Sequence, residues 1–280
     1  MKSSPGTEPN ALDELRRNPA SRRSFLKTMG AAGLGVAAVA LLDGCGGGGG
    51  ILSNVNNANS KLPAALQSLP GTGDQKILNY ALTLEFLEAD LYRQALNLAS
   101  GKPQTAALGN SPSNYTLAIG SGGLDSFNTA AGFAYLRDFA FVENAHAQFL
   151  KTALGGNAVS PNAKGYSFGK LTPSSIDLKS LLTAILPLEE TGVRAYLGVG
   201  GYFSSLQLLQ TAVAIYSTEA RHSSSLNYIL GKDPGPYTLA GDKFLYAVNG
   251  TSVSDNTFEH FLDPQDVINT IGASGLGLVL

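Results

Sequence analysis

Glu143-Asn144-Ala145-His146 and Glu219-Ala220-Arg221-His222 repeat one pattern, Glu-x-x-His, in a chain of 280 residues with only three histidines. On an α-helix, residues i and i+3 project from the same face. Each pattern therefore presents one carboxylate and one imidazole to a common point, and these are two ligand types for one metal ion. Because two of the three histidines share the pattern, we favour a common function over helix-surface pairs that happen to repeat.

Two further segments carry a matching glutamate. Glu85 precedes Tyr92 by seven residues, and Glu189 precedes Tyr196 by the same interval. Seven residues span about two helical turns, so each glutamate shares a face with its tyrosine. The order along the chain is therefore Glu, Glu-x-x-His, Glu, Glu-x-x-His, which indicates a duplicated helix pair.

Apolar periodicity and turn residues predict four long helices and a short one. The expected ranges are 74–99, 125–154, 174–199, 204–230 and, for the short helix, 264–271. Asp74 is the expected N-cap of the first helix. Pro187 is expected to kink the third helix or to break it just before Glu189. The aromatic residues of the second helix, Phe139 among them, are expected to fill the core rather than to carry a radical or an electron.

Four carboxylates and two neutral imidazoles are the ligand set of a di-iron or di-manganese site in a four-helix bundle. The sequence therefore predicts an all-α fold, a four-helix bundle with a long crossover between its second and third helices and irregular N- and C-terminal extensions. The bundle is expected over residues 74–231, after a linker at 51–73 and before a mostly irregular extension at 232–280.

The first 50 residues carry a pattern typical of export. Ser21-Arg22-Arg23-Ser24-Phe25-Leu26-Lys27 precedes an apolar run from Met29 to Leu42, and the combination resembles a twin-arginine export signal. The run of about 14 residues is too short for a membrane-spanning helix. We therefore expect the twin-arginine export machinery as a partner and a location in the periplasm or on the outer side of the cell envelope.

Leu42-Asp43-Gly44-Cys45 resembles a bacterial lipoprotein cleavage box, followed by the glycine tether 46–50. Asp43 departs from the small neutral residue usual there. Cys45 is therefore either the lipid-bearing first residue of the mature protein and its membrane tether, or a thiol that ordinary cleavage nearby discards or leaves free. As the only cysteine, it excludes a disulfide within the chain and any Cys-x-x-Cys site.

The formal net charge is −2, and no Lys/Arg cluster lies beyond residue 27. These features exclude nucleic acid as an expected partner. A homo-oligomer is compatible with the sequence but does not follow from it.

The helix pattern resembles the ferritin-like superfamily. Glu219-Ala220-Arg221-His222 together with Leu188-Glu189-Glu190-Thr191-Gly192-Val193-Arg194-Ala195-Tyr196 is similar to the bacterial and plant ferritin-like family that includes desiccation-related proteins, over about residues 75–230. The resemblance implies three kinds of metal ligand. They are the terminal carboxylates Glu85 and Glu189, the bridging carboxylates Glu143 and Glu219, and the imidazoles His146 and His222.

Several neighbours have roles that the sequence leaves open. Glu88 and Glu190 are alternatives to Glu85 and Glu189 as metal ligands. Either could instead support a ligand without binding the metal itself. Tyr92 and Tyr196 could orient ligands by hydrogen bonds, as could Arg194 and Arg221, although both arginines fit a solvated helix face equally well. His260 has no glutamate three positions earlier and is expected to be structural.

The resemblance also implies two iron or manganese ions, because imidazole ligands favour these metals over Mg²⁺ or Ca²⁺. The expected function is di-metal redox chemistry of the peroxide-scavenging or ferroxidase type, in oxidative or desiccation stress. One alternative is a non-catalytic, stress-protective envelope protein with an empty or degenerate site, in which protonation or arginine pairing neutralises the buried carboxylates. A metal store is a third hypothesis, and it requires a hollow oligomeric shell.

Overall fold

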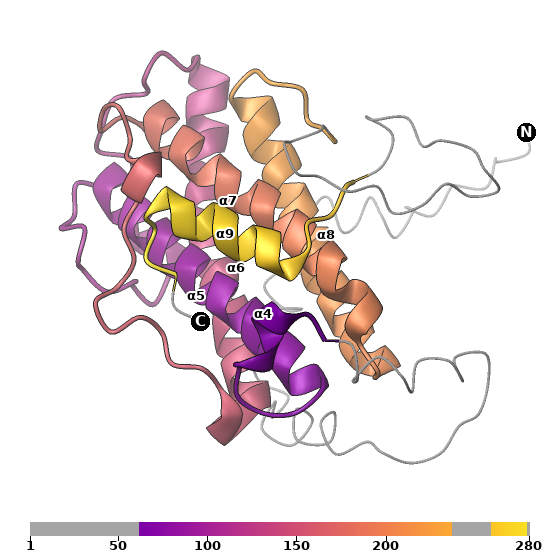
Figure 1. Ribbon diagram of the computed structural model, residues 1–280. Coiled ribbons are helices and arrows are strands. Elements are labelled where there is room, and N and C mark those ends of the chain that lie inside the picture. Colours follow the sequence, from indigo (N-terminus) through magenta and orange to yellow (C-terminus); the bar gives the residue numbers. More distant parts are fainter. Residues whose placement is uncertain (1–61, 237–258, 279–280) are drawn as a thin grey trace, which may run out of the picture. The chain divides into compact units, whose positions relative to one another are not determined.

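The computed structural model describes residues 62–236 and 259–278, all within one compact unit, Gly48–Leu280. Four long helices pack as a bundle (Figure 1), which confirms the predicted all-α architecture. They are α5 (Asp74–Ala99), α6 (Ser126–Leu154), α7 (Leu178–Val199) and α8 (Leu206–Ile229). Two shorter helices, α4 (Ala64–Gln67) and α9 (Pro264–Ser274), precede and follow them in the chain. The predicted export signal and Cys45 lie outside the described residues. Among those described, no helix is long and apolar enough to span a membrane.

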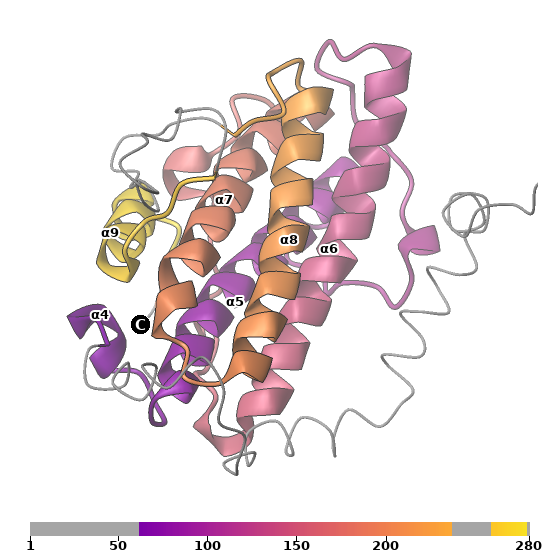
Figure 2. The same ribbon diagram turned by 90° about the vertical axis from the view of Figure 1, so that its right-hand side faces the viewer.

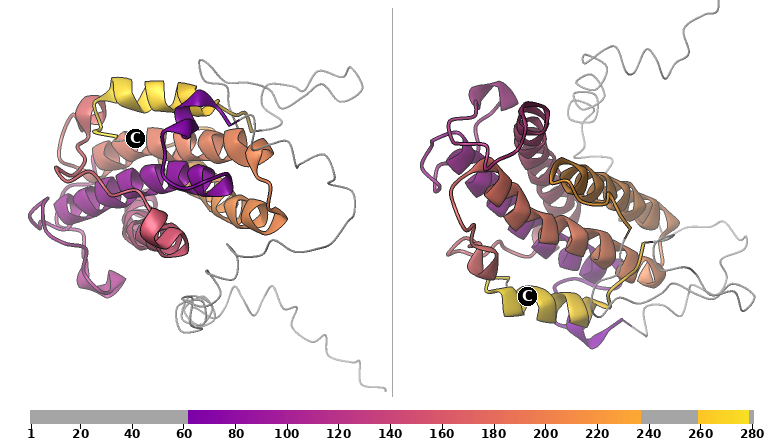
Figure 3. Two further views of the ribbon diagram at one scale, coloured as in Figure 1. Left: turned by 60° about the horizontal axis from the view of Figure 1, so that its bottom comes forward. Right: turned by 90° about the horizontal axis from the view of Figure 1, so that it is seen from above.

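The bundle consists of two helix pairs. α5 packs mainly on α6, and α7 packs mainly on α8, while α5 also contacts α7 and α6 contacts α8. Most residues of α5 and α7 are buried, whereas α6 and α8 each bury one face. The difference arises because α4 and α9 lie on the α5–α7 side of the bundle, away from α6 and α8 (Figures 2 and 3).

The C-terminal segment closes against α7. The Leu262 amide donates to the carbonyl of Arg194, and a Cβ at Gly198 would lie only 2.0 Å from the Leu262 carbonyl oxygen. This close approach requires glycine at position 198. Pro264 begins α9 at a position where its missing N–H costs nothing, and Val267 and Ile271 are buried. The short helix predicted at 264–271 is therefore present as α9, and it packs against α7 and α4.

The start of α5 differs from the prediction in one useful respect. Gly73 precedes the helix, and Asp74 is its first residue rather than its N-cap. The Asp74 carboxylate instead accepts hydrogen bonds from the backbone amides of Ser204 and Ser205. The expected cap is therefore wrong, and the side chain joins the start of α5 to the start of α8.

α7 also corrects the sequence-based expectation. It begins at Leu178 rather than at 174, because Asp177 caps it by accepting a hydrogen bond from the Ser180 amide. The helix continues without a break through Pro187 to Val199, so of the two expected outcomes the break is wrong, and the kink stays a prediction. Proline removes one backbone donor from the helix, and packing on α5, α8 and α9 holds the two halves together.

The segment predicted as a linker contains α4. Leu66 and Leu69 are buried, and α4 contacts both α5 and α9. Four residues are too few for a helix that is stable alone, so these contacts supply its stability.

Candidate metal centre

The six predicted ligands converge between the four long helices. Glu85, Glu143, Glu189 and Glu219 have no solvent-exposed surface, and His222 is buried as well. Their donor atoms form two groups, each with all atoms within 4.8 Å of one another. One group is Glu85, Glu143, Glu219 and His146, and the other is Glu143, Glu189, Glu219 and His222. Because Glu143 and Glu219 belong to both, the geometry provides two adjacent ion positions that share two carboxylates.

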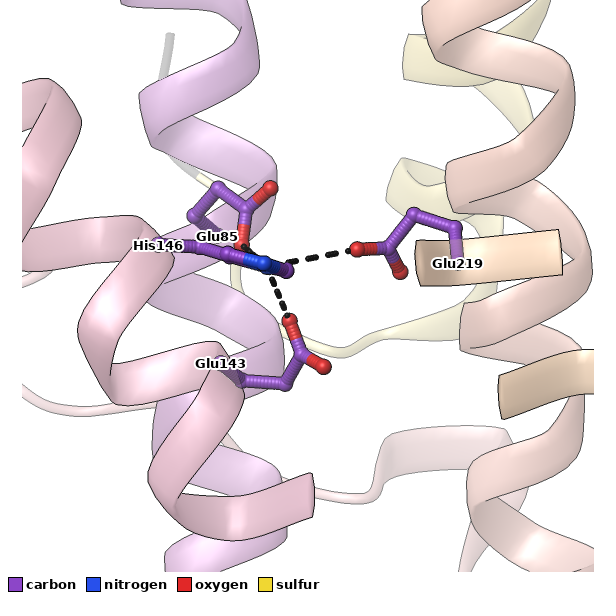
Figure 4. Close-up of side chains that lie close together, drawn as sticks. All are labelled: Glu85, Glu143, His146 and Glu219. Atoms are coloured by element: carbon purple, nitrogen blue, oxygen red, sulfur yellow. Dashed lines mark hydrogen bonds and ion pairs between the residues drawn. The ribbon is translucent and has the colours of Figure 1, made fainter. Parts of the chain in front are cut away.

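His146 is at the centre of the first group (Figure 4). Its Nδ1 lies 3.0 Å from Glu143 Oε2 and 3.4 Å from both Glu85 Oε2 and Glu219 Oε1. α6 places Glu143 and His146 one turn apart, and α5 and α8 supply the other two carboxylates. Four donors from three helices therefore face one point.

His222 has the corresponding position in the second group. Its Nδ1 lies 2.8 Å from Glu143 Oε1 and 3.4 Å from Glu189 Oε2. Despite these short distances, neither His222 Nδ1 nor either oxygen has a partner in hydrogen-bonding geometry among the described residues. The donors converge on a point rather than on one another, as ligands of an ion do.

Several carboxylate oxygens share this lack of partners. Glu85 Oε2 and both oxygens of Glu219 are buried and accept no hydrogen bond within the described part of the chain. Polar atoms buried in this way are costly unless something else satisfies them. Two divalent ions would do so at six donor residues at once, so the residues present fit a di-metal centre.

The chain itself compensates the buried charges with protons. Burial would lower the pKa of His222, but the Glu189 and Glu143 carboxylates outweigh it and raise that pKa to about 11. Burial would raise the pKa of Glu143, but His146 and His222 lower it to about 2. Burial raises the pKa of Glu219, and the neighbouring carboxylates of Glu143 and Glu189 add to the increase. The core therefore favours imidazolium beside Glu143 and retained protons on other carboxyl groups, which metal ions would have to displace.

The two tyrosines orient the terminal carboxylates crosswise. Tyr92 of α5 donates its hydroxyl proton to Glu189 of α7, and Tyr196 of α7 donates to Glu85 of α5. The sequence indicated the hydrogen-bonding role, and the equal spacing hinted at the symmetry. The exchange of partners between helices depends on how α5 and α7 face each other, which spacing alone does not encode.

Comparison with known families agrees with this geometry. A family described as the ferritin-like domain matches residues 73–232, more than half of the chain and all four long helices. The chain belongs to the ferritin-like domain family. A comparison with curated proteins finds no match.

The ferritin-like domain holds a further carboxyl group beside the two clusters. Glu88 is buried outside both groups, and its Oε2 has no hydrogen-bond partner among the described residues. Its Oε1 lies 3.1 Å from where a Cβ at Gly192 would be, and Glu219 Oε2 lies 3.2 Å from the same point. Burial, followed by the nearby charge of Glu219, raises the pKa of Glu88 well above its usual value. Glu88 is therefore adjacent to the centre, while Glu85 is the member of the cluster.

Glu190 has a separate role in the ferritin-like domain. Its carboxylate accepts hydrogen bonds from Arg194, Ser223 and Asn227, and it lies outside both clusters. Arg194 is fully buried, so the solvated-face interpretation is wrong for it, and it orients Glu190 rather than a cluster carboxylate. Arg221 is exposed on α8.

His260 is buried in the C-terminal segment and lies outside both clusters.

The aromatic residues of α6 do not all fill the core as expected. Phe127 is largely exposed, while Phe139 stacks on the ring of His222 with 3.7 Å between centroids. No sequence pattern indicates this contact directly. Phe139 lies four residues before Glu143, one turn away on the same face, which is the only hint that spacing provides.

Proposed function

We propose that this ferritin-like domain binds two iron or manganese ions in a carboxylate-bridged centre and uses them in redox reactions with O2 or H2O2. The observation that supports the proposal most directly is the pair of overlapping four-residue clusters that share Glu143 and Glu219. Iron or manganese held there would supply one electron per ion to such an oxidant. Carboxylate and imidazole ligands suit both metals.

The protein contributes position and exclusion of water. The terminal carboxylates are held by Tyr92 and Tyr196, which fix the oxygens that remain free to bind an ion. The surrounding helices bury the four glutamates completely, so water does not compete for these oxygens. Rigid helices rather than loops supply all six side chains, which favours a fixed geometry.

Metal analysis tests this proposal. The full chain, freed of metal by EDTA and reconstituted with Fe²⁺ without oxygen or with Mn²⁺, is expected to bind two ions. Glu143→Ala removes a shared carboxylate, so it is expected to bind one ion or none. Glu190→Gln is the matched control, because Glu190 is a buried glutamate next to Glu189 but outside both clusters, and this variant is expected to retain two ions.

Failure to bind metal, or equal binding by Glu143→Ala and the wild type, would contradict the proposal. The loaded protein is further expected to consume H2O2 or to oxidise Fe²⁺ with O2. Two bound ions with neither activity would refute the redox role and keep the metal centre. Absence of bound ions would favour the alternative of a stress-protective protein with an empty or degenerate site.

We also propose export, a lipid tether at Cys45 and a role in oxidative or desiccation stress, on the basis of the resemblances in the sequence alone. Replacing Arg22 and Arg23 together by lysine is expected to retain the protein in the cytoplasm. Cell fractionation would measure this, and unchanged distribution of the double variant would refute twin-arginine export.

Cys45→Ala is expected to release the exported protein from the membrane fraction. The stress role is tested separately, and a deletion strain that survives drying and peroxide as well as the wild type would refute it.

A further inference from the structure

The two imidazoles of the centre have different surroundings. The side chain of His222 is 4% exposed, whereas that of His146 is 15% exposed. The symmetric order of motifs in the sequence predicts equivalent surroundings for the two histidines. The difference in exposure therefore arises from the way the helices pack.

Phe139 accounts for the low exposure of His222. Its ring stacks on His222 with an angle of 25° between the planes, and Tyr135 stacks on Phe139 with 5.2 Å between centroids and an angle of 10°. Tyr92, which holds Glu189, meets the same Phe139 ring edge-on at 6.4 Å. One aromatic side chain thus contacts both an imidazole of the second group and the tyrosine that orients its terminal carboxylate.

The His146 side has no such cover. Among the ring contacts of the described residues, none involves His146, although Phe141 on the same helix packs edge-on against Tyr115 of the loop before α6. His146 can therefore rotate away from its cluster without breaking a stack, while rotation of His222 must displace Phe139.

We propose that the two ion positions are inequivalent, with exchanging ions and small oxidants entering at the His146 position while Phe139 seals the His222 position. This inference rests on the proposed di-metal function. Phe139 acts as a positioning residue through His222. An ion leaves a buried site only after a ligand moves aside, and the stacked ring opposes that movement on one side only.

Ion release tests the inference. The Mn²⁺-loaded full chain is mixed with excess EDTA, and the manganese that stays with the protein is measured after rapid desalting at increasing times. Two phases of equal amplitude are expected, one ion per chain in each. Phe139→Leu is expected to accelerate the slow phase by about three- to tenfold, the loss expected for one aromatic contact, and to leave the fast phase unchanged.

Phe141→Leu is the matched control, because it removes a half-buried ring from the same helix. Among the described residues, this ring makes a ring contact with Tyr115 and with neither His146 nor His222. This variant is expected to leave both phases unchanged. His146→Ala is expected to abolish the fast phase and retain the slow one. Phe139→Met provides a second variant if Phe139→Leu folds poorly, which thermal unfolding of the metal-free proteins would reveal.

Release of both ions in a single phase from the wild type would overturn the inference and leave the di-metal proposal intact. Acceleration of both phases by Phe139→Leu, or the same effect from Phe141→Leu, would also overturn it, because general loosening of the bundle would then explain the result. Absence of bound manganese would instead refute the di-metal proposal itself.

Discussion

Gly192 occupies the place in α7 that Glu88 occupies in α5, since each lies three residues after a terminal glutamate of the centre. Only one half of the duplicated pattern therefore carries a carboxyl group at this position. The missing side chain at Gly192 leaves room for Glu88 Oε1 and Glu219 Oε2, at 3.1 and 3.2 Å from a Cβ built there. The glycine is explained by close approach, because it lies inside a helix where alanine would otherwise be favoured.

Gly192→Ala is accordingly expected to separate stability from metal binding. Alanine favours the helix by about 1 kcal/mol, so the metal-free protein should be as stable as the wild type or slightly more so. The new methyl group should displace the Glu219 carboxylate and weaken Mn²⁺ binding about tenfold, an effect similar to that of disturbing a ligand's supporting contacts. Calorimetric titration with Mn²⁺ and thermal unfolding measure the two effects. Gly201→Ala is the control, because no atom of the described residues other than its chain neighbours lies within 4 Å of its Cβ position. Equal Mn²⁺ affinities of the two variants would contradict this view.

The crossed tyrosines give a second prediction for single residues. Tyr92→Phe removes the hydrogen bond to Glu189, and Tyr196→Phe removes the one to Glu85. Each is expected to weaken one of the two Mn²⁺ binding steps about 10- to 100-fold, as loss of a ligand's hydrogen-bond partner usually does. Because the partners cross, Tyr92→Phe should affect the ion held by His222, and Tyr196→Phe the ion held by His146. Combining each variant with His146→Ala, which leaves one position, would distinguish them, and an effect of Tyr196→Phe that persists in that background would refute the crossed assignment.

Among the helices, the start of α5 is joined to the start of α8 by a single side chain. Asp74 accepts hydrogen bonds from the Ser204 amide, the Ser204 hydroxyl and the Ser205 amide. Asp74→Ala leaves these donors without their partner and is expected to lower the free energy of unfolding by about 2 kcal/mol. The number of Mn²⁺ ions bound should remain two, because Asp74 is outside both clusters. Urea unfolding measures the loss of stability. Asp138→Ala is the control, because Asp138 belongs to an exposed ion pair. Equal stabilities of the two variants would contradict the role given to Asp74.

The helices also show how far sequence reasoning extends. Apolar periodicity and glycine or aspartate boundaries located all four long helices to within about four residues, and motif spacing selected the six residues that converge, because both depend on local geometry. Asp74, the crossed tyrosines and the Phe139 stack depend on which helix faces which, and no spacing along the chain determines that. Pro187 shows the same limit in reverse, since the local signal allowed either a kink or a break, and the helix continues through it without a break.

On the scale of the whole molecule, one core holds more carboxyl groups than imidazoles to balance their charge. Five of them, those of the two clusters and Glu88, lie buried near only two imidazoles. The metal-free bundle therefore depends on bound protons for its charge balance. Two divalent ions would replace those protons, so uptake should release protons and strengthen as pH rises.

This charge balance fixes the sign of the pH dependence of the metal-free protein. The pKa of His222 is raised from 6.5 to about 11, so its contribution to stability is complete below pH 6.5 and is lost as pH rises towards 11. Burial raises the pKa of Glu219 above 4.5 in the folded state, so its tendency to ionise also opposes folding as pH increases. The pKa of Glu143 is lowered from 4.5 to about 2, and its contribution is lost only as pH falls below 4.5. The His222 effect therefore lowers stability as pH rises above 6.5, and the Glu219 effect has the same sign.

The metal-free protein is therefore expected to lose stability steadily between about pH 6.5 and 8.5, while the stabilisation conferred by Mn²⁺ increases over the same range. Thermal unfolding at several pH values, with EDTA and with Mn²⁺, measures both trends. His222→Gln should reduce the loss of stability of the metal-free protein with rising pH, because it removes one of the proton-binding groups. His260→Gln is the control, because it replaces a buried histidine outside the clusters, and it should leave this loss of stability unchanged. A metal-free protein that becomes more stable from pH 6.5 to 8.5 would show that the core does not rely on protons, and the carboxylates would then need another source of compensation.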